Sequence, residues 1–273
     1  MINERIIKLK NRIYSFVAYN RRRAGVRLLG NFCDKILKSY ENSNYDVYTN
    51  GEYYVLKSLA KADLKVIFDV GANVGDWALM VNKIHPKAEI HCFEIVPSTF
   101  EELKERIKNN SQIILNKMGL SDYEGSVEIK YFPENSTLST AVDYPHSLES
   151  VKVNCSVTTG DSYVKRNDIG QIDFLKIDVE GVEHLILKGF EESLRNGQIS
   201  VVQFEYGYAN VLSRFLLRDH YEFFTERGYK VGKIYPNYID FRDYELTDEN
   251  FIGPNYLAVH SKREDLIQLL VHN

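Results

Sequence analysis

The stretch Val66-Ile-Phe-Asp-Val-Gly-Ala-Asn-Val-Gly-Asp76 places a glycine-rich turn directly after a compact apolar run. The run Val66–Val70 is typical of a buried β-strand, and residues 76–84 repeat apolar side chains at helical spacing. Gly71 permits a tight turn between the two, and Gly75 keeps the start of the helix close to whatever binds there. We therefore expect a strand, a turn and a helix that together hold a ligand.

Strand and helix patterns alternate along the rest of the chain. Four more apolar runs predict strands at 89–93, 113–117, 174–178 and 200–204, and helical patterns cover 98–109, 182–188 and about 212–227. Strands joined by helices pair in parallel and are covered on both faces, so the fold class is α/β with a doubly wound, mostly parallel sheet. Two last runs, 229–235 and 256–260, have no helix pattern between them and should end the sheet as an antiparallel hairpin.

One segment interrupts this alternation. Residues 126–131 and 151–157 are typical of extra strands, and they flank a polar segment that contains His146. Ligands of open α/β sheets bind near the carboxyl ends of the strands, so this insertion is placed to cover a substrate; a plain surface loop is the alternative. We predict a basic helical extension over residues 1–60 and a body over residues 61–273 with an inserted β segment at about 126–157.

The composition is that of a folded protein rather than a disordered or membrane-spanning one. The 273 residues include 34 Lys and Arg against 38 Asp and Glu, a formal charge of −4, and 44% are hydrophobic. No apolar run exceeds five residues, whereas a membrane-spanning helix needs about 20. The three cysteines form no C-x-x-C pair, which fits a reducing compartment. We therefore expect the protein to stay in the cytoplasm.

The first 39 residues carry ten basic side chains and two acidic ones, a formal charge of +8. Ile6, Leu9, Ile13 and Phe16 recur at helical spacing, and a similar pattern continues from Val26. Two amphipathic, basic helices are the simplest interpretation. Such helices can contact the inner face of an anionic membrane or hold a polyanion, but charged helix faces are more often simply solvated.

Charge decides which ligand suits the turn. Glu94 ends the second strand, 23 residues after Gly71, where a carboxylate can bind both ribose hydroxyls of a nucleoside. A dinucleotide-binding pattern would need glycine where the chain has Asn73 and Asp76, and an aspartate there would repel a pyrophosphate. Asp69 and Asp76 instead suit a ligand with an ammonium and a sulfonium group, which is S-adenosylmethionine. A glycine turn with Asp76 as a plain helix cap is the alternative.

A second acidic stretch, Phe174-Leu-Lys-Ile-Asp-Val-Glu-Gly-Val-Glu183, delivers carboxylates at the end of a buried strand. Asp178 leaves that strand beside the expected ligand, and Glu180 and Glu183 start the next helix. One carboxylate could serve as a general base, or Asp178 and Glu205 could hold a divalent metal ion. The alternative is that these acids cap the helix and order loop amides.

Together these stretches resemble the FkbM family of class I S-adenosylmethionine-dependent methyltransferases. The resemblance runs from about residue 45 to residue 259 and rests on five stretches, 49–52, 68–75, 93–94, 116–125 and 173–183. It implies a seven-stranded doubly wound sheet with an antiparallel last strand, and methyl transfer to an oxygen, commonly a hydroxyl of a sugar or a polyketide-type natural product. Two family patterns differ in this chain: T-x-D is Thr158-Thr-Gly-Asp161, and F-E-P is Phe93-Glu-Ile-Val-Pro97.

The resemblance also assigns cofactor residues by position. The methionine part of S-adenosylmethionine would contact the turn, the ribose would contact Glu94, and the adenine would lie at the turn from residue 119 to residue 122. The residues matched in this way are Asp69, Gly71, Asn73 and Gly75 at the first turn, Gly119, Ser121 and Asp122 at the adenine, and Asn50 and Glu52 in a further motif. Asp76 is a cofactor candidate on its charge alone.

A hydroxyl acceptor must be aligned with the sulfonium methyl and must lose a proton as the bond forms. The candidate bases are Asp178 first, then His146 and His184. The candidates for contact with the acceptor are Glu180, Tyr206 and Tyr208. The partner is then a hydroxyl-bearing small molecule or glycan, for which polysaccharide biosynthesis is the expected setting.

Other function classes stay open on the sequence alone. A nicotinamide-dependent oxidoreductase would share the sheet and Glu94 but not Asp76. A non-catalytic relative that binds the cofactor or a glycan would keep the fold and lack a base. We expect no nucleic-acid partner, because the body is acidic; an RNA acceptor reached through the basic first 39 residues is the alternative. Homo-oligomerisation and a divalent metal are not decided.

Overall fold

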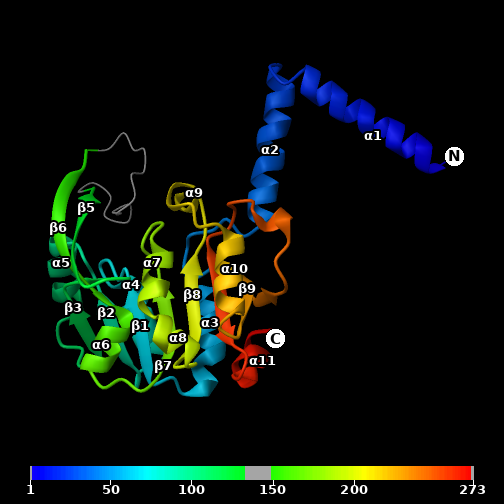
Figure 1. Ribbon diagram of the computed structural model, residues 1–273. Coiled ribbons are helices and arrows are strands. Elements are labelled where there is room, and N and C mark those ends of the chain that lie inside the picture. The colour runs from blue at the N-terminus through cyan, green and yellow to red at the C-terminus, as the bar shows by residue number, and fades with distance from the viewer. Residues whose placement is uncertain (1, 133–148, 272–273) are drawn as a thin grey trace. The chain divides into compact units, whose positions relative to one another are not determined.

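The computed structural model describes residues 2–132 and 149–271 (Figure 1). The chain divides into two compact units, Met1–Ser43 and Asn44–Asn273. The first unit holds helices α1 (Ile2–Tyr19) and α2 (Ala24–Tyr40), and none of their described side chains is buried. Residues 44–60, which the sequence-based division places in the extension, lie in the second unit.

The second unit is built on a central sheet of eight strands (Figure 1). Five strands run parallel: β1 (Val66–Val70), β2 (Glu89–Phe93), β3 (Ile113–Asn116), β7 (Ile172–Ile177) and β8 (Ile199–Glu205). Three more strands pair antiparallel with their neighbours: β9 (Tyr229–Tyr235), β10 (Tyr238–Phe241) and β11 (Asn255–His260). The order β10-β9-β11-β8-β7-β1-β2-β3 confirms the doubly wound, mostly parallel α/β class. The sheet has one strand more than the seven implied, because β10 extends it as a hairpin with β9.

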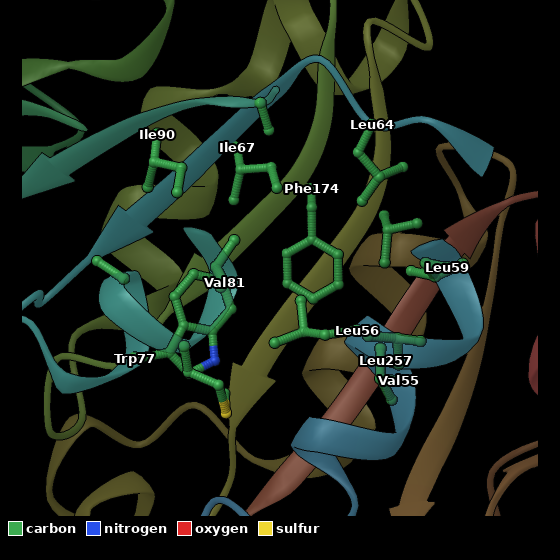
Figure 2. Close-up of a cluster of buried hydrophobic side chains, with 14 of the residues drawn as sticks. Val55, Leu56, Leu59, Leu64, Ile67, Trp77, Val81, Ile90, Phe174 and Leu257 are labelled. Carbon is green, nitrogen blue, oxygen red and sulfur yellow. The ribbon is translucent and has the colours of Figure 1, made fainter. Parts of the chain in front are cut away.

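Helices cover both faces of the sheet because consecutive residues of a strand point to opposite sides. Ile67 of β1 packs on one face, in a cluster with helices α3 (Glu52–Leu59), α4 (Asp76–Ile84), α5 (Pro97–Ile107) and α11 (Glu264–Val271). Phe68, the next residue, packs on the other face with α6 (Gly160–Arg166), α7 (Glu183–Gly189), α8 (Glu191–Arg195) and α10 (Leu217–Thr225). Figure 2 shows the first cluster, in which Phe174 of β7 packs on Trp77 of α4 with ring centroids 5.9 Å apart.

The extra strands form a separate three-stranded sheet. Its strands are β4 (Gly119–Ser121), β5 (Gly125–Tyr131) and β6 (Val151–Thr159), in the order β4-β6-β5. The predicted strands 126–131 and 151–157 are therefore β5 and β6, and β4 joins them through parallel pairing with β6. The polar segment with His146, which we expect to cover a substrate, lies outside the described residues.

The helix predicted over about 212–227 is divided in two. Helix α9 (Ala209–Ser213) ends at Arg214, whose φ of 57° is left-handed, and α10 begins at Leu217. Two short 3₁₀ turns complete the described chain, η1 (Ala60–Ala62) and η3 (Leu246–Asp248). Among the described residues, no helix is long and apolar enough to cross a membrane.

Candidate active site

A cavity of about 680 Å³ lies at the carboxyl ends of β1, β2, β7 and β8, where the β4-β6-β5 sheet also borders it. Strand β1 pairs with β2 on one side and β7 on the other, so the cavity lies at the point where the strand order reverses. This is the usual ligand position in an open α/β sheet. Among the described lining residues none is Lys, Arg or His, and six are acidic: Glu52, Glu94, Asp178, Glu180, Glu183 and Glu205.

At the cavity wall, the glycine turn after β1 contacts the ends of two neighbouring strands. Gly71 has a φ of 88°, and a Cβ there would lie 1.9 Å from the carbonyl oxygen of Asp178. The amides of Gly71 and Ala72 both donate to the carbonyl of Phe93 at 3.0 Å. The chain after β1 thus contacts the ends of both β7 and β2, which only glycine at position 71 allows.

Glu94 follows β2 and faces the cavity with a buried carboxylate. Its Oε2 accepts a hydrogen bond from the backbone of Asn73 at 2.9 Å, and its Oε1 accepts one from Val96 at 2.8 Å. Burial raises the pKa of Glu94 to about 7, although both backbone donors favour the charged form. Gly71, Asn73 and Glu94, which the sequence analysis predicts to contact a cofactor, all line the cavity.

Two acids expected at the ligand lie elsewhere. Asp69 is completely buried behind the turn, 3.8 Å from the Lys176 ammonium, and burial raises its pKa to about 6. Asp76 is exposed and forms an ion pair with Arg106. Neither lines the cavity, because Asp69 faces a cation inside the sheet and Asp76 faces solvent. Gly75 and Asp122 are also absent from the cavity wall, and Gly75 instead packs against α5.

Three carboxylates converge at the ends of β7 and β8. Asp178, Glu180 and Glu205 can each place an oxygen within 4.8 Å of the other two. Burial and the neighbouring acids raise the pKa of Glu180 to about 8 and that of Glu205 well above its usual range. Two chemistries fit this donor set: carboxyl groups that share a proton, or oxygen ligands around a divalent cation.

Lys176 keeps Asp178 in place. Its Nζ donates to Asp178 Oδ2 at 2.7 Å, while Oδ1 accepts no hydrogen bond from the described residues. Burial alone would lower the pKa of Lys176, because it disfavours the charged ammonium. The attraction of Asp178, Asp69 and Glu52 is larger, so the pKa of Lys176 lies above its ordinary value. Sequence reasoning did not identify this residue. The signal was a lysine in the middle of an apolar strand, which requires buried acids as partners.

A buried amide network closes the cavity near α3. Glu52 accepts hydrogen bonds from Gln203 at 2.7 Å, Asn50 at 2.8 Å and Asn255 at 3.3 Å. These partners come from the loop before α3, from β8 and from β11. Glu52 thus connects the start of α3 to two strands that lie far from it in the sequence. Asn50 and Glu52 line the cavity, as does Asn255, which the sequence analysis missed.

The other predicted residues fall into two groups. Gly119, Ser121, Glu183, Tyr206 and Tyr208 line the cavity. Within this group, the Glu183 carboxylate accepts from the Gly181 amide at 3.0 Å, and burial raises its pKa to about 7. His184 lies outside the cavity wall, its ring stacked on Phe215 at 5.0 Å. His146 lies outside the described residues.

The two tyrosines differ in their freedom to contact an acceptor. Tyr206 is buried and donates its hydroxyl to Glu249 at 2.6 Å, so it has a structural partner. Tyr208 is 60% exposed at the cavity and stacks on Phe251. Of the pair, Tyr208 has the ring surface that a bound sugar could reach.

Comparison with known proteins shows which family the chain is similar to. The family model of the methyltransferase FkbM domain matches residues 69–231, more than half of the chain. Hexuronic acid methyltransferase AglP of Haloferax volcanii is 27% identical over 145 residues, which cover 52% of this chain and 56% of that protein. The 31-O-demethyl-FK506 methyltransferase FkbM of Streptomyces tacrolimicus is 26% identical over 156 residues, covering 47% and 60%.

One more relative and one solved structure are also methyltransferases by name. The 2-O-methyltransferase NoeI of Sinorhizobium fredii is 28% identical over 155 residues, covering 51% of this chain and 63% of that protein. A solved structure of methyltransferase FkbM from Methylobacillus flagellatus has a TM-score of 0.45 at 15% identity, covering 72% of this chain and 43% of that one. The matches thus span less than two thirds of each of these relatives. The family match includes the glycine turn, Glu94, Asp178 and Glu205, and the chain belongs to the FkbM methyltransferase family.

Proposed function

We propose that this protein is an S-adenosylmethionine-dependent O-methyltransferase that acts on a hydroxyl of a sugar, a glycan or a related natural product. The observation that carries the proposal is the acidic character of the cavity: six carboxyl residues and no basic residue among its described lining. Such a wall attracts an ammonium and a sulfonium, which favour the ionised form of carboxyl groups whose pKa burial has raised, and it repels a pyrophosphate. It therefore favours S-adenosylmethionine over a nicotinamide dinucleotide.

The residues present fit this cofactor in three places. Glu94 is a buried carboxylate at the end of β2, and each of its oxygens keeps a second lone pair for a ribose hydroxyl. Gly71 and Asn73 would lie along the methionine part, and Gly119 and Ser121 would border the adenine. When bound, the cofactor supplies an activated methyl group.

The acceptor side would use Asp178. Its Oδ2 is held by Lys176, and its Oδ1 is available to accept the proton that leaves the hydroxyl oxygen as the new bond forms. Lys176 is a positioning residue, because it fixes the carboxylate and keeps a cation beside it. Glu180 and Glu205 lie close enough to take part in proton sharing or to hold a divalent ion with Asp178.

The acceptor class is supported by two kinds of observation. The name of one relative refers to a hexuronic acid, and the names of two others refer to a 2-O and a 31-O position. Each name therefore points to an acceptor that carries oxygen. In this chain Tyr208 presents an exposed ring at the same cavity. We propose that the acceptor is a hydroxylated ring compound, and that the protein methylates it in the cytoplasm during polysaccharide biosynthesis.

Calorimetric titration of the full chain with S-adenosylhomocysteine, S-adenosylmethionine and NAD tests the cofactor. We expect heat of binding with both sulfur nucleosides and none with NAD. Binding of NAD alone would favour the oxidoreductase alternative. A panel of uronic acids, hexoses and oligosaccharides with S-adenosylmethionine, followed by mass spectrometry, then tests transfer. A mass gain of one methylene identifies an acceptor, and cofactor binding without any product would favour a non-catalytic relative.

A further inference from the structure

Helix α1 carries an apolar stripe of exposed side chains. Ile6, Leu9, Ile13 and Phe16 are each more than half exposed. On a helix with 3.6 residues per turn these four positions fall within an arc of about 80°. A continuous row of exposed aliphatic and aromatic side chains is costly in water, so a binding partner is expected.

Helix α2 has a second stripe of the same width. Leu29, Phe32, Ile36 and Tyr40 are each more than half exposed and also fall within about 80°. We call these eight residues the apolar stripes. Because α1 and α2 have no described buried side chain, the first unit does not bury the stripes in a hydrophobic core of its own.

Basic residues accompany both stripes. Arg5, Lys8 and Arg12 lie along one side of the α1 stripe, and the turn between the helices contains the exposed Arg21, Arg22 and Arg23. No carboxylate among the described residues pairs with these three arginines. The segment therefore combines an uncovered apolar surface with a formal charge of +8 over its first 39 residues.

We propose that α1 and α2 bind the surface of an anionic lipid bilayer, with the apolar stripes at the acyl boundary and the arginines among the headgroups. An anionic bilayer satisfies both features at once, since it offers hydrocarbon below a negatively charged surface. A soluble polyanion would pair with the arginines but leave the stripes in water. A second copy of the segment would cover the stripes, but two such segments repel each other by charge.

The test is flotation of the full chain with vesicles of phosphatidylcholine alone and of phosphatidylcholine mixed with phosphatidylglycerol. We expect binding to the mixed vesicles that weakens with added salt, and little binding to the neutral ones. A triple substitution, Arg21→Gln, Arg22→Gln and Arg23→Gln, should weaken binding roughly 100-fold, since each basic residue near an anionic surface contributes roughly a fivefold factor and the three factors multiply. A second variant, Leu9→Ser and Ile13→Ser, should also lose binding.

The matched control removes three exposed charges from the second unit: Lys61→Gln, Lys87→Gln and Lys262→Gln. It should bind the mixed vesicles like the unsubstituted chain, and unchanged binding of S-adenosylhomocysteine or an unchanged melting temperature shows that each variant is folded. Absence of vesicle binding, equal binding to neutral vesicles, or equal loss in the control would overturn the proposal. So would a dimer, measured by light scattering, that the Leu9→Ser, Ile13→Ser variant abolishes while vesicle binding is absent.

Discussion

Glu94 is held by two backbone amides and still faces the cavity, so its substitution separates cofactor binding from folding. Replacing the charged acceptor by the amide in Glu94→Gln should weaken S-adenosylhomocysteine binding about tenfold to a hundredfold, the range for hydrogen bonds to a charged group. Calorimetric titration measures this change. Glu105→Gln, an exposed residue of α5, should leave the dissociation constant unchanged, and an unchanged constant in Glu94→Gln would remove the residue from the cofactor site.

Asp178 belongs to the acceptor side, so its substitution should have a different kinetic effect. Asp178→Asn removes the proton acceptor, and we expect kcat to fall by about two to four orders of magnitude, the usual contribution of a general base. The dissociation constant of S-adenosylhomocysteine should change only a few-fold. Steady-state kinetics with an identified acceptor measure the effect; a kcat that stays within a factor of about two would assign the base elsewhere.

At the residue scale the sequence predicts chemistry better than it predicts position. Gly71, Asn73, Glu94 and Asp178 line the cavity because their places at strand ends follow from local pattern. Asp69 does not, because the partner that draws it inside the sheet, Lys176, comes from a strand about a hundred residues later. That pairing depends on the register of β1 and β7, which no local pattern contains.

At the scale of elements, Asp161 connects two helices. Its Oδ2 accepts from the Glu192 amide at 2.8 Å and its Oδ1 from the Ser193 amide at 3.0 Å, which satisfies the free amides at the start of α8. Asp161→Ala should therefore lower the free energy of unfolding by about 2 kcal/mol, at the upper end for a helix cap. Urea denaturation followed by circular dichroism measures this loss.

The matched control for Asp161→Ala is Glu222→Ala, an exposed acid of α10, which should leave the midpoint unchanged. Cofactor affinity should be the same in both variants, and a normal midpoint in Asp161→Ala would contradict the capping role. Gly160, next to Asp161, packs where a Cβ would lie 2.3 Å from the ring of Phe190. The stretch Thr159-Gly160-Asp161 therefore keeps the family's T-x-D pattern, which corrects the departure that the sequence analysis stated.

The parallel strands and most helices of the body were predictable because each is a long, strongly periodic or apolar segment. Strands β4 and β10 were not, since they have three and four residues and exist through their pairing with β6 and β9. The break between α9 and α10 was missed for a similar reason. Arg214 carries no local signal for the left-handed conformation that it adopts.

For the whole molecule, the acidic cavity makes stability depend on pH. The folded-state pKa is about 7 for Glu94 and Glu183 and about 8 for Glu180, far above the ordinary glutamate value near 4.3. Between about pH 6.5 and pH 8.5 the unfolded chain has already lost these protons and the folded chain is losing them, so stability falls as the pH rises. Buried histidines such as His220, whose pKa burial lowers to about 3, titrate below this window.

Melting temperatures measured across that pH window test the dependence. We expect a decrease toward high pH in the free protein and a smaller decrease with saturating S-adenosylmethionine, whose positive charges compensate the ionised acids. The double variant Glu180→Gln, Glu205→Gln should have a flatter profile. A melting temperature that stays constant or rises through the same window would show that these carboxyl groups are already ionised in the folded state.

The order of the central sheet also has a consequence for the chain as it emerges from the ribosome. Of the eight strands in this sheet β11 is synthesised after the other seven, yet it lies between β8 and β9 and pairs with both. Until it is released, the edge of β8 has no partner on that side, and the polar groups of its backbone remain open to other strands. Asn255 of the same strand supplies the last donor to Glu52. A nascent chain that lacks β11 therefore has both an exposed sheet edge and an unfinished binding cavity.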